Sequence, residues 1–166
     1  MKKYLYYAAY GSNMCKERFL FYINGGEFRG KQYIGCNEKT PPEDGGWLEI
    51  PYRLYFAKKS STWDSKGVAF LSCNKEPNPI YHSIVRLWKI SEDQFEDIQK
   101  QEGSRWYNVI LHLGNKGGLD IKTFTGCWEK EKQNPSASYI DYIKKGLRET
   151  TQWSDDKINE YLSKFL

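Results

Sequence analysis

Seven short runs of strand-favouring residues constrain the fold of this chain more than any other feature of its sequence. Each run is bounded by turn residues such as glycine, proline or asparagine. The runs are 3–9, 30–36, 48–57, 67–73, 80–90, 107–113 and 119–128. So many strands predict an α+β fold with a closed or nearly closed sheet of about six to seven strands, flanked by a few helices.

Helices are predicted at only a few places in the sequence. Ser91 and Gln94 form a capping box before a helix over 92–101, and Gly103 suits the position just after its end. The glycine-rich segment 114–118 predicts a hairpin that joins the last two strands as antiparallel neighbours. Two further helices near the end of the chain are predicted from apolar residues at helical spacing. These residues are Ile140, Ile143 and Leu147, and then Ile158, Tyr161, Leu162 and Phe165 after a cap at Ser154.

The length and composition of the chain favour one globular domain. It has 166 residues, of which 39% are hydrophobic and 16% aromatic, and no linker or repeat divides it. We therefore expect a single domain over 1–166, with a core rich in tyrosine and tryptophan. The proline-rich segment 40–46 is expected to be a surface loop.

The charged residues indicate no nucleic-acid partner. The net charge is +4, from 25 basic and 21 acidic residues, and the lysines are interspersed with acids. The start of the chain lacks the apolar stretch of a signal peptide, and no run is long enough to span a bilayer. These features predict a soluble cytoplasmic protein with no membrane partner, and we expect a monomer or homodimer.

Four cysteines lie far apart in the sequence, at Cys15, Cys36, Cys73 and Cys127. No C-x-x-C pair is present, so a metal site is not predicted. A disulfide framework would allow three pairings. Without an export signal, however, we expect reduced and semi-buried thiols with a structural role.

The segment Tyr10, Gly11, Ser12, Asn13 and Met14 is the first candidate site. It follows an aromatic strand, and a strand that ends in a small polar turn aims several backbone N–H groups at one point. Such a turn suits a carboxylate or a developing oxyanion. An ordinary junction between a strand and a helix would have the same local pattern.

Glu102 is the second candidate, at the predicted end of a helix. If its side chain points inward among aromatic rings, desolvation raises its pKa and makes it a better proton carrier near neutral pH. A glutamate at a helix end is otherwise a solvated surface residue.

The sequence resembles the γ-glutamylcyclotransferase family in the order and spacing of several short motifs. The motifs are Tyr10-Gly11-Ser12-Asn13-Met14, Ser61-Thr62-Trp63, Gly67-Val68-Ala69, Val85-Arg86-Leu87-Trp88-Lys89-Ile90, Gln101-Glu102-Gly103 with Tyr107, and Asn134-Pro135-Ser136-Ala137-Ser138-Tyr139. The resemblance implies that the first motif binds the γ-glutamyl group, that Glu102 is the catalytic base and then acid, and that Tyr139 is a polar contact at the pocket rim. It also implies a small mixed β-barrel of about six to seven strands and a small-molecule γ-glutamyl substrate. The implied reaction needs no metal or organic cofactor and releases 5-oxoproline and a free amine or amino acid.

Other functions fit the same resemblance. One is a lyase-like member that removes a γ-glutamyl protecting group within a biosynthetic pathway, and another is a binding module that holds a small ligand without turning it over. A glutathione-degrading enzyme fits less well, because that related group has a shorter arrangement.

Overall fold

The computed structural model describes all 166 residues. The strands are β1 (Tyr4–Ala9), β2 (Gly26–Phe28), β3 (Lys31–Tyr33), β4 (Glu43–Ile50), β5 (Leu54–Ser60), β6 (Lys66–Leu71), β7 (Ser83–Ser91), β8 (Val109–Lys116) and β9 (Leu119–Thr125). The α-helices are α1 (Lys16–Asn24), α2 (Glu92–Glu102), α3 (Ala137–Thr151) and α4 (Asp155–Ser163). Four 3₁₀ turns complete the list, η1 (Ser12–Met14), η2 (Ser61–Trp63), η3 (Pro79–Tyr81) and η4 (Glu129–Glu131).

The strands form one main sheet and two small ones. The main sheet has five strands in the order β4-β7-β1-β9-β8, while β2 pairs with β3 and β5 with β6. All of these pairs are antiparallel except β1 with β9. The α+β class is confirmed, but the predicted barrel is not closed, because β4 and β8 are separate edges of the main sheet.

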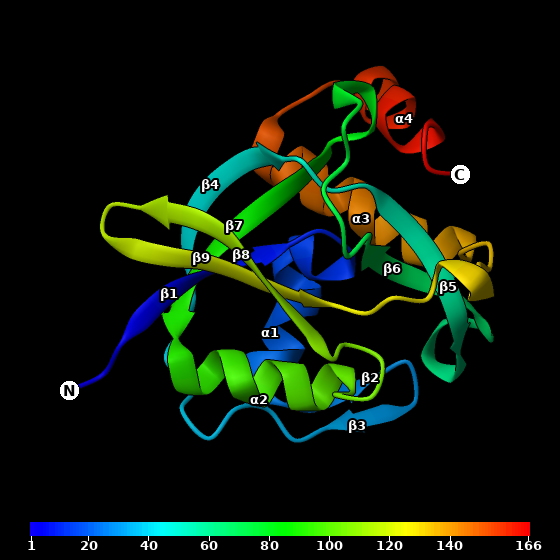
Figure 1. The fold of residues 1–166 in the computed structure, drawn as a ribbon. Helices are drawn as coiled ribbons and strands as arrows, with labels where there is room; N and C mark the ends of the chain where they lie inside the picture. Colours follow the sequence, from blue (N-terminus) through cyan, green and yellow to red (C-terminus); the bar gives the residue numbers. More distant parts are fainter.

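The helices cover different parts of the main sheet. Figure 1 shows α2 near β2 and β3 at one end of the molecule and α4 at the other end. Helix α3 packs against β4, β7 and the turn η1. None of the helices combines the length and the apolar composition needed to cross a bilayer.

Aromatic rings fill much of the core, as the composition predicts. Tyr7 of β1 stacks on Phe124 of β9 with ring centroids 5.3 Å apart, and Phe19 of α1 stacks on Trp88 of β7 at the same distance. All four side chains are buried. The core thus joins α1 to the three central strands of the main sheet.

One predicted strand and one predicted loop differ from the structure. The run 48–57 is two strands, because the chain leaves β4 at Pro51 and starts β5 at Leu54 in a different sheet. Proline cannot donate a ladder hydrogen bond, which explains the break. The segment predicted as a loop over 40–46 already enters β4 at Glu43, with a register shift between Asp44 and Trp47 in its pairing with β7.

The predicted helices agree with the structure more closely than the predicted strands do. In α2 the Ser91 hydroxyl accepts from the Gln94 N–H at 3.1 Å, and the Gln94 side chain accepts from the Ser91 N–H at 3.0 Å. Gly103 follows the helix with a φ of 103°, which favours glycine. The two predicted helices near the end of the chain are α3 and α4, and the cap at Ser154 accepts from the Lys157 N–H at 3.2 Å.

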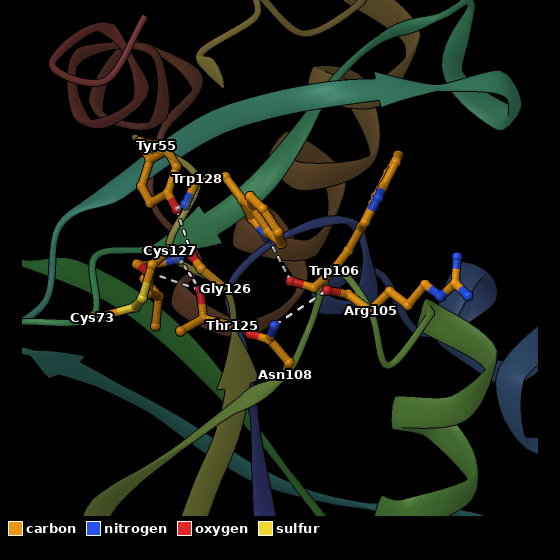
Figure 2. Close-up of a disulfide and its surroundings, with 10 residues drawn as sticks. Tyr55, Cys73, Arg105, Trp106, Asn108, Thr125, Gly126, Cys127 and Trp128 are labelled. Carbon is orange, nitrogen blue, oxygen red and sulfur yellow. Dashed lines mark hydrogen bonds between the residues drawn. A yellow bond between two sulfur atoms is a disulfide. The ribbon is translucent and has the colours of Figure 1, made fainter. Parts of the chain in front are cut away.

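The prediction that all cysteines are reduced was wrong. Cys73, after β6, and Cys127, after β9, form a disulfide (Figure 2), whereas Cys15 and Cys36 are free and buried. The ends of β6 and β9 lie side by side, since the Thr125 hydroxyl exchanges hydrogen bonds of 2.8 Å with the Leu71 N–H and carbonyl. This proximity joins cysteines that are 54 residues apart, so the spacing in the sequence did not reveal the pair.

Candidate active site

The chain after β1 turns sharply through η1. The N–H groups of Met14 and Cys15 donate to the carbonyls of Gly11 and Ser12, each at 3.0 Å. As at any helix start, the first N–H groups have no partner within the turn. Here these are the N–H groups of Ser12 and Asn13.

Two side chains of β7 and the close approach of α3 at Gly146 hold the carbonyl side of this turn in place. The Trp88 indole N–H donates to the Asn13 carbonyl at 3.0 Å, and Arg86 Nη1 donates to the Met14 carbonyl at 2.7 Å. Gly146 lets α3 approach so closely that an added Cβ would collide with Met14. The carbonyl side of the turn is thus held by side chains of the fold, while the Ser12 N–H lies against the Tyr139 hydroxyl.

Gly11 is required by the space around it. A Cβ at this position would lie 2.9 Å from the Tyr139 hydroxyl and 3.0 Å from the Ala69 Cβ. A larger residue would therefore push the turn away from Tyr139.

Glu102 and the turn meet, although 89 positions separate Glu102 from Asn13 in the sequence. Glu102 is the last residue of α2, and its Oε1 accepts a hydrogen bond of 2.8 Å from the Asn13 amide. The same amide donates to the Tyr7 hydroxyl at 3.2 Å. Asn13 therefore orients the carboxylate from the turn that was predicted as a binding loop.

Burial raises the pKa of the Glu102 carboxyl above its ordinary value of 4.5. The charge of Arg18 opposes this shift most strongly, and contacts with Tyr22 and Asn13 and the charge of Lys31 oppose it further. The side chain is only partly buried. A partly desolvated carboxyl with a raised pKa is suited to take up and return a proton near neutral pH.

Two small pockets meet at Glu102. The first, which we call the loop pocket, is lined by the turn and by tyrosines. The second, the Arg18 pocket, is lined by Arg18, Lys31, Trp63 and Trp106 among others. Both pockets include Ser12, Glu102, Tyr107 and Tyr139 in their walls.

The other predicted residues of the site divide between the loop pocket and the core. Tyr10 lines the loop pocket and donates from its hydroxyl to the Phe124 carbonyl at 2.7 Å. Tyr139 lies deeper than the predicted rim, because it is only 4% exposed and its hydroxyl accepts from the Ala69 N–H at 3.0 Å. Met14 is fully buried and lines neither pocket.

Sequence reasoning missed Tyr7, Arg18, Tyr22 and Tyr107 as parts of this site. Tyr107 belongs to one of the sequence motifs, but no role was predicted for it. Its hydroxyl donates to the Ala69 carbonyl at 3.0 Å. One signal was available for Arg18, because it occupies the buried face of α1 with Phe19 and Tyr22. A charged residue on an apolar helix face needs a partner, and that need points to a site.

The segment that follows Cys127 of the disulfide contacts Trp106, which lines the Arg18 pocket. Figure 2 shows Trp106 beside the chain that leaves Cys127. The Trp128 indole N–H donates to the Trp106 carbonyl at 2.7 Å, and the Tyr55 hydroxyl donates to the Gly126 carbonyl at 2.6 Å.

No three histidine, cysteine, aspartate or glutamate side chains converge as a metal-binding group.

Comparison with solved structures identifies the fold. A γ-glutamyl cyclotransferase matches with a TM-score of 0.71 and 18% identity, over 96% of this chain and 86% of that one. An uncharacterized human protein matches with a TM-score of 0.70 and 18% identity, over 96% and 86% of the two chains. YkqA from Bacillus subtilis matches with a TM-score of 0.63 and 18% identity, over 97% of this chain and 53% of that one. The chain therefore has the γ-glutamyl cyclotransferase-like fold that its sequence resemblance implied.

Comparison of sequences adds one curated relative. Histone deacetylase 5 of Arabidopsis thaliana is 30% identical over 202 aligned positions, which include 96% of this chain. The chain spans only 30% of the length of that relative, so the activity in the relative's name is not carried over to it. No family model matches the sequence.

Proposed function

We propose that this chain is a cyclotransferase that cleaves a γ-glutamyl amide and releases 5-oxoproline. The observation that carries the proposal is the hydrogen bond of 2.8 Å between the Asn13 amide and the Glu102 carboxylate. It supports the proposal because Glu102, the proposed proton carrier, contacts the turn that resembles the γ-glutamyl-binding loop. The fold of the solved γ-glutamyl cyclotransferase supports the same assignment.

An unpaired acceptor beside Glu102 fits the substrate's α-ammonium group. Asn13 Oδ1 is buried and has no hydrogen-bond partner, while the Nδ2 of the same side chain is held by Glu102 and Tyr7. A buried acceptor without a donor is costly. An ammonium group bound at Asn13 Oδ1 and Glu102 would remove that cost and stand beside the base.

The reaction then needs only proton transfer and ring closure. The Glu102 carboxylate takes a proton from the α-ammonium, and the freed amine attacks the γ-carbonyl carbon of the same molecule. The carbonyl oxygen becomes an oxyanion, the C–N bond to the departing nitrogen breaks, and the carbonyl re-forms in the lactam. Two protons pass overall from the attacking to the departing nitrogen, and Glu102 is placed to carry them.

The turn η1 is suited to stabilise the oxyanion. The N–H groups of Ser12 and Asn13 have no partner within the turn, whose carbonyls are held by Trp88 and Arg86. Such pre-organised donors typically contribute about 10²-fold or more each to the rate. We therefore assign the oxyanion site to the N–H side of this turn.

The proposal is tested by incubating the purified protein with γ-glutamyl amino acids and γ-glutamyl amines and assaying 5-oxoproline. Compounds with a free α-amine and a γ-amide should react. Their α-linked and N-acetylated counterparts should not, because neither can close the five-membered ring. Comparable turnover of the N-acetylated compound would indicate hydrolysis, and binding without turnover would indicate a ligand-binding module.

A further inference from the structure

The guanidinium of Arg18 lies in a box of aromatic rings. Arg18 is only 2% exposed, and its Nη2 donates to the hydroxyls of Tyr22 and Tyr33, each at 2.9 Å. Its central carbon lies 4.7 Å and 4.9 Å from the ring centroids of these tyrosines, 4.3 Å from that of Phe28 and 5.7 Å from that of Trp63. The group is thereby held in one orientation.

Two nitrogen atoms of this guanidinium have no hydrogen-bond partner, and no carboxylate lies within ion-pair distance of it. Nε and Nη1 of Arg18 are buried and make no hydrogen bond, and Arg18 forms no ion pair with a carboxylate. Buried charges are ordinarily paired, and an unmet donor costs free energy. The aromatic faces offset part of this cost. The free N–H groups remain available to an anionic ligand.

The position of Arg18 relative to Glu102 tells which part of a substrate it would meet. If the γ-glutamyl group occupies the loop pocket, its amide bond lies at the shared wall that contains Glu102. The departing amine must then extend into the Arg18 pocket. That pocket holds two cations, Arg18 and Lys31, against the single carboxylate of Glu102, between walls that include Trp63 and Trp106.

We propose that Arg18 is the binding site for a carboxylate on the departing group. The planar guanidinium matches a carboxylate in shape and charge, and it is already oriented by its aromatic box. This inference rests on the function proposed above. It implies that the departing group is an amino acid or peptide with a free carboxylate rather than a simple amine.

The experiment compares two substrates that differ in one group. γ-Glutamyl-alanine and γ-glutamyl-ethylamine share the glutamyl part and differ by the carboxylate of the departing group. The ratio of their kcat/KM values should favour the alanine compound by about 10- to 100-fold, as expected for hydrogen bonds to a charged group. A wild-type preference for the ethylamine compound would overturn the inference.

Variants then assign the preference to Arg18. In Arg18→Met the loss of kcat/KM should be at least about 10-fold larger for the alanine compound than for the ethylamine compound. The matched control is Lys16→Met, which removes an exposed charge from the same helix and should keep the wild-type preference. Equal loss on both substrates would overturn the inference, because Arg18 would then bind the glutamyl carboxylate or act only in folding.

Two further measurements apply if Arg18→Met does not fold or if the protein does not turn over these compounds. If Arg18→Met does not fold, Lys31→Gln changes an exposed side chain of the same pocket and should reduce the preference by a few fold. An unchanged preference would then count against the inference. Calorimetric binding of the two compounds to Glu102→Gln gives the preference without turnover. The absence of 5-oxoproline together with tighter binding of the alanine compound would contradict the proposed function but not the carboxylate site.

Discussion

The amide of Asn13 donates a hydrogen bond of 2.8 Å to the carboxylate of Glu102, and this contact joins the first turn of the chain to the end of α2. The contact has a chemical consequence, because an amide donor favours the ionised form of the carboxyl. Burial acts in the opposite direction and prevails, since the pKa of Glu102 is raised. Burial thus shifts the pKa of the proposed base upward, in the direction that suits a group that takes up and returns a proton.

Replacing the donor of this contact by a second carboxylate should move the pH dependence of the reaction. In Asn13→Asp two carboxylates share one site, so the last proton leaves at a higher pH than in the wild type. The acidic limb of kcat/KM should shift upward by about one pH unit or more. Asn13→Ser, which removes the same donor without adding a charge, is the control and should shift the limb less than Asn13→Asp. An unchanged limb in Asn13→Asp would mean that Glu102 does not set it.

The stability of the protein should depend on the charge of Glu102. Because the pKa of this acid is raised on folding, its penalty is absent below the unfolded value near 4.5 and develops as the pH rises through the folded pKa. Glu102→Gln should therefore melt at an equal or higher temperature than the wild type at pH 7. The difference should shrink at pH 4, and a lower melting temperature at pH 7 would contradict the expected sign.

Gly11 and Tyr139 should be coupled in stability. Gly11→Ala introduces a Cβ 2.9 Å from the Tyr139 hydroxyl, and overpacking of this kind costs about 1–3 kcal/mol. Tyr139→Phe removes that oxygen and should recover part of the loss when the two changes are combined. The recovery is partial because Ala69 also lies close to the added Cβ. Additive effects in a double-mutant cycle by urea unfolding would show that the hydroxyl is not the obstacle.

The disulfide should contribute substantially to stability. Cys73→Ser with Cys127→Ser removes a bond across 54 residues, and losses of about 2–4 kcal/mol are typical. Urea unfolding with and without a reductant measures the effect, and the double variant serves as the control that should not respond to the reductant. Identical unfolding midpoints for the wild type in both conditions would contradict this prediction.

Local rules predicted the parts of the fold that depend on neighbours in the sequence. The capping box at Ser91 and Gln94 and the glycine after Glu102 define α2, so the position of Glu102 at a helix end was readable. The hairpin of β8 and β9 followed from its glycines in the same way. In these cases the backbone conformation is set by residues a few positions apart.

The predictions that were wrong concern residues that are far apart in the sequence and meet only after folding. The disulfide requires that the ends of β6 and β9 are neighbours in the fold. The predicted closed barrel is not formed, because β5 and β6 pair with each other in a separate sheet. The aromatic box around Arg18 draws on α1, β2, β3 and η2, which no local pattern connects. A buried cation on the apolar face of α1 was the one sequence signal for it.

The most direct test of the account is the rate of 5-oxoproline formation by Glu102→Gln, measured beside its thermal melting. The amide keeps the shape of the side chain but cannot accept and return a proton, so the rate should fall by about 10²- to 10⁴-fold with the fold retained. Glu96→Gln, at an exposed position of the same helix, is the matched control and should keep the wild-type rate. A folded Glu102→Gln protein with near wild-type turnover would contradict the assignment of Glu102 as the proton carrier.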